Sequence, residues 1–159
     1  MIVSDAGPLI IFARLGRLSL LRDVTGHLTI PLAVNAETMV NQGTMPGAAE
    51  IAQADWIVRE TIADQSLLPL LAGSLHEGER EAIALAAERN AQLLMDEIRG
   101  RRVATQLGIE VIGSLRILGE AKRIGIIESV GPLLKEMRSN GYRIDHDLMR
   151  RFLDAMNEA

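Results

Sequence analysis

The sequence predicts an α/β protein built on a parallel β-sheet. Short runs of apolar, strand-forming residues alternate with longer segments whose composition favours helices, and proline or glycine separates many of them. Strands that are separated by helices form βαβ units, in which consecutive strands run parallel. The chain has 159 residues, of which 48% are hydrophobic. These values suit one domain with a sizeable core, so we expect a single domain over residues 1–159.

Five strands and at least seven helices follow from this pattern, ahead of a helical C-terminal tail. The strands are expected at 1–4, 27–31, 56–60, 91–96 and 109–114. The helices are expected at 8–16, 17–26, 32–43, within 44–54, and at 77–90, 99–108 and 115–125. The segment 77–90 has the strongest helical pattern because it is rich in Ala and Glu. The tail, about 126–157, is expected to form two helices around the sequence NGYRI.

The composition excludes several classes of site. There is no cysteine, which removes disulfides, thiolate metal sites and cysteine nucleophiles and fits the cytoplasm, where we expect the protein. The three histidines lack the spacing of a zinc site. No signal peptide is visible and no apolar run approaches about 18 residues, so we expect no membrane association. The net charge of −4 disfavours a broadly basic coat for nucleic acid but leaves room for a local basic patch.

Polar residues follow three of the predicted strands directly. Asp5 follows the first strand, Asp96 and Glu97 follow the fourth, and Ser114 follows the fifth. Ligands of open parallel sheets bind at the carboxyl ends of the strands. The sequence therefore predicts an acidic site at that edge of the sheet.

Acidic residues on two helices could reach the same edge. Glu37 lies one turn into the helix after the second strand, and Glu81 lies early in the Ala- and Glu-rich helix. If Gly78 is the N-cap of that helix, Glu81 is at position N3, where the helix dipole favours a negative charge. Glu79 is next to Glu81 and could share its role.

Each of these acids also has a purely structural interpretation. Asp5 could cap the helix that follows it, and Asp96 could be a turn or cap residue. Glu37 could be a solvated helix position. Glu79 and Glu81 could serve only to complement the helix dipole. The placement of all of them around one sheet edge favours a shared site.

Carboxylates that meet from distant parts of a chain repel one another unless a cation neutralises them. An all-oxygen ligand set suits Mg²⁺ or Mn²⁺. Such ions lower the pKa of bound water and stabilise the charge that develops in phosphodiester cleavage. A basic run with Arg99, Arg101 and Arg102 could hold phosphate, although it could also be a solvated helix start.

The order of these motifs resembles that of the PIN domain superfamily, and more closely its branch of small prokaryotic PIN-like proteins. Four blocks carry the likeness, and the later ones are the more specific: IVSDAGPLI, IPLAVNAET, GEREAIALA and LLMDEIRGRRVATQLGIEVIGSL. The stretch GEAKRIGIIESVGPLLKEMRSNGYRI is similar to the C-terminal helices of that branch.

The resemblance implies a three-layer α/β/α sandwich and a ribonuclease dependent on Mg²⁺ or Mn²⁺. Many prokaryotic PIN domains are toxins of toxin–antitoxin pairs, which implies RNA and a cognate antitoxin as partners. The catalytic and metal-binding acids it implies are Asp5, Glu37, Glu81 and Asp96. Glu79 and Glu97 would lie at the metal as well. Ser114 matches a polar position that supports the site and is counted with the arginines as substrate-binding.

Other functions compete with this one. The chain could be a binding or regulatory module with the same fold and little catalysis. A phosphotransfer domain is disfavoured, since Gly7 stands where haloacid-dehalogenase-type phosphatases need a second aspartate. A Leu-rich helical segment at 9–21 could serve a homodimer.

Overall fold

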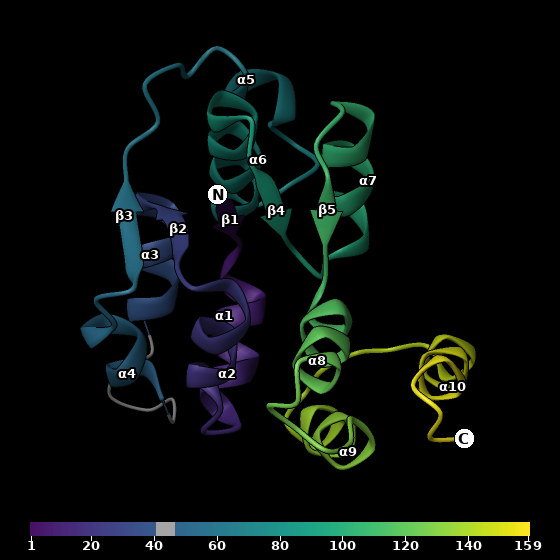
Figure 1. The fold of residues 1–159 in the computed structure, drawn as a ribbon. Helices are drawn as coiled ribbons and strands as arrows, with labels where there is room; N and C mark the ends of the chain where they lie inside the picture. The colour runs from purple at the N-terminus through teal and green to yellow at the C-terminus, as the bar shows by residue number, and fades with distance from the viewer. Residues whose placement is uncertain (41–46) are drawn as a thin grey trace.

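The computed structural model describes residues 1–40 and 47–159 and is built on one five-stranded parallel sheet (Figure 1). The spatial order is β3-β2-β1-β4-β5, and each neighbouring pair is parallel. The strands are β1 (Ile2–Ser4), β2 (Leu28–Pro31), β3 (Ile57–Glu60), β4 (Gln92–Leu94) and β5 (Val111–Ile112). All five lie inside the predicted strand segments, so the predicted α/β fold with a parallel sheet is confirmed.

The helices agree with the sequence pattern except at one position. They are α1 (Ala6–Arg14), α2 (Leu18–Thr25), α3 (Leu32–Met39), α4 (Ala48–Gln53), α5 (Leu68–Leu71), α6 (Glu77–Arg89), α7 (Ile98–Gln106), α8 (Ser114–Arg123), α9 (Gly131–Ser139) and α10 (His146–Ala155). The short helix α5 was not predicted. The predicted end of the helix at 32–43 and the start of the loop at 44–54 fall outside the described residues.

The sheet order reverses between β1 and β4, the central strands. From β1 the chain steps to β2 and β3 on one side, and α6 then carries it back to β4 on the other side. The two strands are in register, with Ser4 opposite Leu94, and the Asp5 N–H donates to the Leu94 carbonyl over 2.9 Å. Such a switch point is where open α/β sheets bind ligands.

Helix α6 begins at Glu77, where the sequence pattern predicts a helix, but its N-cap differs from the candidate considered above. Its N-cap is His76 rather than Gly78, so the N3 position belongs to Glu79 and not to Glu81. Acidic residues in the first turn favour this start, and Asn90 ends the helix in a left-handed conformation with φ 49°. The helix packs on β1, β2 and β4 and against α3, which holds its N-terminal turn beside the switch point.

The Leu-rich segment at 9–21 is not one exposed helix. It is divided between α1 and α2, and most of its apolar side chains are buried in the core, including Leu9, Phe12 and Leu21 at 0% exposure. The segment is therefore mostly part of the core, and a homodimer stays a prediction. Gly47, in a left-handed conformation with φ 83°, lies directly against the Ala13 backbone, where a Cβ would clash.

The C-terminal helices stand beyond the sheet, and α10 lies at the margin of the molecule beside α8 and α9 (Figure 1). Every residue of α10 is at least partly exposed. Glu158, just after this helix, accepts hydrogen bonds from the Val130 and Gly131 N–H groups at the start of α9, at 2.9 Å in each case at closest. It also accepts one from Lys122 of α8 over 2.7 Å. One carboxylate thus joins all three helices.

In the described ranges, no helix is both long and apolar enough to cross a membrane.

Candidate active site

An acidic pocket of about 580 Å³ lies at the switch point of the sheet. Five carboxylic acids line it: Asp5, Glu37, Glu79, Asp96 and Glu97. They come from the ends of β1 and β4, from α3 and from the first turn of α6. Segments far apart in the sequence therefore place their acids around one cavity, as the strand-end pattern predicted.

Asp5 is the most deeply buried of these acids, with 7% of its surface exposed. It occupies the N-cap position of α1, but its side chain makes no capping hydrogen bond, and its Oδ1 is buried without a partner among the described residues. Burial raises the pKa of Asp5 to about 7; the Ala6 N–H opposes this shift, and the charges of Glu37, Glu79 and Asp96 add to it.

Glu79 and Glu37 face the same pocket from two packed helices. Glu79 is 9% exposed, and its pKa is raised by burial, against hydrogen bonding and charge from His76. Partial burial of its carboxyl group and the charge of Glu79 also raise the pKa of Glu37. The Glu37 carboxylate lies close to α6, since a Cβ at Gly78 would be 2.9 Å from its Oε1 atom.

Glu81 lies apart from this group. Its Oε2 atom accepts a hydrogen bond of 2.8 Å from the Ala33 N–H in the first turn of α3. That amide is one of the donors that a helix leaves unsatisfied at its start. Glu81 therefore binds the N-terminal turn of α3 and does not line the pocket, whereas Glu79 does. The two residues are separated by about 200° of rotation around the helix, so only one of them can face the pocket.

Asp96 is held by the start of α8. Its Oδ1 accepts the Ser114 N–H over 2.8 Å, and its Oδ2 accepts the Ser114 hydroxyl over 2.5 Å. Tyr142, which follows α9, donates its hydroxyl to Oδ1 over 3.3 Å. Asp96 is thus a cap, as one interpretation of the sequence had it, but it caps α8 rather than the helix that follows it in sequence, whose N-cap is Glu97.

Ser114 is fully buried and contacts Asp96 instead of the open pocket. The serine orients the carboxylate on which the site depends. This placement suits a supporting residue and gives the hydroxyl no route to a substrate.

The predicted basic run does not line the pocket. Arg101 donates to the Met95 carbonyl over 2.8 Å, and Arg99 donates to the Ser74 carbonyl over 3.2 Å. Arg102 is exposed on α7. Two of the three arginines are therefore engaged with the backbone of this chain.

Sequence reasoning missed five other residues of the pocket. They are Arg14, His76, Asn140, Tyr142 and Arg143. Arg14 lies seven residues after Gly7 on one face of α1, a spacing that could have identified it. No local pattern connects Asn140–Arg143 with β1, because only the folded chain brings the C-terminal segment to this edge.

The donor set of the pocket fits a hard divalent cation. All five acids offer oxygen ligands, and the buried, unpartnered Asp5 Oδ1 leaves a position that a cation would satisfy. Across the described residues, no three His, Asp or Glu side chains are already close enough to hold an ion as a group. The structure thus shows an open acidic pocket, not a preassembled cluster.

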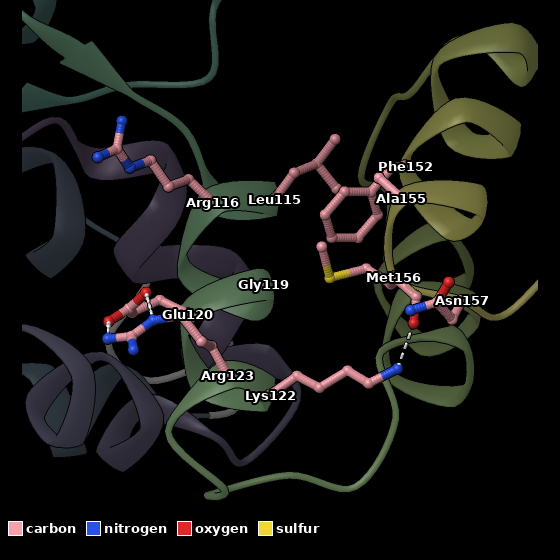
Figure 2. A pocket seen from close by; sticks show the side chains of 10 residues that line it. All are labelled: Leu115, Arg116, Gly119, Glu120, Lys122, Arg123, Phe152, Ala155, Met156 and Asn157. Carbon is pink, nitrogen blue, oxygen red and sulfur yellow. Dashed lines mark hydrogen bonds and ion pairs between the residues drawn. The ribbon is translucent and has the colours of Figure 1, made fainter.

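A second cavity, of about 570 Å³, lies between α8 and α10. Figure 2 shows Leu115 on α8 facing Phe152 on α10 and Met156 directly after it, while Lys122 reaches the Met156 carbonyl. No cluster of acids lines it, and each of its charged side chains is engaged with another group of the chain. It is a junction between helices.

The fold and the pocket together define a parallel α/β domain with an acidic site at its switch point. A family of PIN domains (DUF3368) matches residues 1–158, and the chain belongs to this family. PIN domains are generally nucleases and typically use divalent metals. The earlier resemblance to the superfamily is thereby confirmed.

A solved structure supports the fold independently. A PilT N-terminus domain protein from the hyperthermophilic archaeon Sulfolobus solfataricus P2 superposes with a TM-score of 0.57 at 16% sequence identity. The similarity covers 76% of this chain and 93% of that protein. No curated protein matches the chain.

Proposed function

We propose that this protein is a metal-dependent ribonuclease that cleaves phosphodiester bonds of single-stranded RNA. The observation that carries the proposal is the acidic pocket at the switch point, in which Asp5 has a buried oxygen without a partner among the described residues. Burial, and to a smaller extent repulsion between neighbouring carboxylates, raises the pKa of Asp5, Glu37 and Glu79. A site that is strained in this way without a cation is suited to binding one.

The residues divide into ligands and supports. Asp5, Glu37, Glu79 and Asp96 would hold Mg²⁺ or Mn²⁺, and Glu97 lies beside them at the exposed rim. A bound cation of this kind lowers the pKa of water and neutralises charge on phosphate oxygens. Ser114 and Tyr142 fix the direction of the Asp96 carboxylate.

Paired substitutions of Glu79 and Glu81 test this site sharply. We expect Asp5→Asn and Glu79→Gln to reduce Mn²⁺-dependent cleavage of a single-stranded RNA by at least 100-fold. Glu81→Gln keeps an acceptor for the Ala33 N–H and should retain cleavage within a few-fold of wild type. EDTA should abolish the activity. Equal loss in both Glu variants, or equal activity in wild type and Asp5→Asn, would contradict the assignment.

A toxin role within a toxin–antitoxin pair is part of this proposal and is supported by the resemblance to small prokaryotic PIN-like proteins. Induced expression should then arrest growth, and both Asp5→Asn and co-expression of a neighbouring antitoxin gene should relieve the arrest. Growth that is unaffected by the wild-type protein would remove the toxin role and leave the ribonuclease proposal in place.

One observation favours a second candidate, a binding module with little catalysis. Asp96 already accepts three hydrogen bonds, and the described acids form no preassembled ligand cluster. Measurable binding of Mn²⁺ and RNA, without turnover of any of several RNAs, would support this candidate.

A further inference from the structure

Two arginines at the rim of the acidic pocket, Arg14 and Arg143, have no role in the site described above. We infer that Arg14 and Arg143 bind backbone phosphates of the RNA strand, and that the segment Asn140–Arg143, called here the rim segment, positions that strand. The inference rests on the proposed function and assigns its binding residues, in place of the basic run on α7.

One face of α1 forms a continuous side of the pocket. Gly7, Ile10 and Arg14 all line it, at the spacing of three to four residues that places side chains on one helix face. Gly7 has no neighbouring atom near the place a Cβ would take, so the backbone is open there. At about 1.5 Å per residue, Arg14 lies roughly 13 Å along the helix from Asp5. A phosphate bound by Arg14 is therefore a different one from the phosphate beside the acids.

The rim segment joins the two ends of the pocket. At one end, Nη1 of Arg14 donates to the Asn140 carbonyl over 3.3 Å. At the other end, the Tyr142 hydroxyl donates to Asp96 over 3.3 Å. Gly141 stands between them with φ 97°, a conformation that favours glycine. The rim segment thus runs along the pocket from Arg14 to Asp96, and it brings Arg143 to the same cavity.

The charge of these two arginines is available for a ligand. Both are exposed, and neither forms an ion pair with an acid of the described chain. The hydrogen bond from Arg14 Nη1 to the neutral Asn140 carbonyl leaves the charge of this guanidinium unneutralised. Five other arginines are paired with an acid among the described residues: Arg22, Arg89, Arg116, Arg123 and Arg150. Guanidinium groups match phosphate geometry with paired donors.

An RNA strand needs such an attraction at this pocket. Five acids line it and the whole chain carries a net charge of −4, so a polyanion is repelled except where positive charge is concentrated. The two arginines on the rim supply that charge at the border of the acids. They would hold the strand so that a neighbouring phosphate reaches the carboxylates.

The test measures binding of a labelled single-stranded oligoribonucleotide to the full-length protein in EDTA, where cleavage does not interfere. Fluorescence anisotropy over a series of KCl concentrations gives the affinity and its salt dependence. We expect Arg14→Gln and Arg143→Gln each to weaken binding about three- to tenfold. The slope of log affinity against log salt should fall by about 0.7 for each arginine removed. Arg151→Gln, an exposed arginine of α10 outside the pocket, is the control with the same charge change.

The outcomes separate the two proposals. The inference is supported if both rim variants bind more weakly and with a smaller salt dependence than wild type, while Arg151→Gln keeps the wild-type affinity and salt dependence. Wild-type affinity and slope in the double variant Arg14→Gln/Arg143→Gln overturns it and leaves the ribonuclease proposal standing. Wild-type protein that does not bind the oligoribonucleotide in EDTA overturns the inference, whereas the ribonuclease proposal is decided separately by the Mn²⁺-dependent cleavage assay. Thermal unfolding of each variant verifies that it is folded.

Discussion

Asp5 places a carboxyl group where the fold gives it little solvation and an oxygen without a partner in the described chain. Its raised pKa means that the folded protein binds more protons than the unfolded chain between about pH 4 and pH 7. The stability of the metal-free protein should therefore fall as the pH rises through this window. If Asp5 binds a cation as proposed, it destabilises the fold when the cation is absent.

Substitution of Asp5 tests this conflict directly. In EDTA, the free energy of unfolding of Asp5→Asn relative to that of wild type should rise by about 2–3 kcal/mol between pH 5 and pH 8. The reason is that about two pH units of that interval lie below the pKa of Asp5 in the folded protein. Urea unfolding of both proteins at pH 5 and at pH 8 measures this change in unfolding free energy. The control, Asp55→Asn, replaces an exposed aspartate outside the pocket and should show the same difference from wild type at both pH values. A pH-independent difference for Asp5→Asn would contradict the raised pKa.

At the scale of elements, the C-terminal helices reach the site through a chain of contacts that begins at Glu158. This carboxylate satisfies the first N–H groups of α9, and the other end of α9 leads into the rim segment. Helix α10 has no buried residue of its own, so its place depends on such contacts and on Phe152 and Met156 facing α8 (Figure 2). The position of Tyr142 at Asp96 therefore depends on packing well outside the pocket.

Loss of the Glu158 charge should loosen this junction. We expect Glu158→Gln to lower the free energy of unfolding by about 1–2 kcal/mol and to speed hydrogen exchange of the Val130 and Gly131 amides. Burial opposes ionisation of Glu158, but the bonds from Lys122, Val130 and Gly131 outweigh it and lower its pKa. The contribution is therefore complete above the ordinary pKa of a glutamate and is lost as the pH falls through the lowered value.

Glu128→Gln is the matched control, since Glu128 is exposed in the loop before α9. It should leave exchange of both amides unchanged. Equal exchange in Glu158→Gln and wild type would show that the carboxylate does not hold the junction.

For the whole molecule, the sequence predicted the sheet better than the site. Alternating apolar runs and helical segments identify the strands because burial on both faces leaves a continuous apolar signal. Asp5 and Asp96 could be placed from this pattern, since a strand end fixes the edge on which a residue lies. Glu79 and Glu81 could not be distinguished, because the sequence does not show which of these two opposite faces of α6 turns toward the sheet edge. Arg14 and Arg143 come from opposite ends of the chain and are joined only by tertiary packing.

The response of the whole molecule to a divalent cation follows from the same acids. A cation that binds only the folded state stabilises it by about 2.7 kcal/mol at a concentration one hundred times its Kd. For a chain of this size that corresponds to a rise in Tm of roughly 5–10 °C. Protons compete for Asp5, Glu37 and Glu79, whose pKa values are raised.

The rise in Tm caused by Mn²⁺ should therefore be larger at pH 8 than at pH 5.5, and Asp5→Asn should reduce the rise at pH 8. NaCl at matched ionic strength is the control, because screening alone acts on all surface charges and is not specific to the pocket. Differential scanning fluorimetry measures each case. An equal rise in Tm with Mn²⁺ and with NaCl, or one that Asp5→Asn leaves unchanged, would show that the acids of the pocket do not bind the cation together.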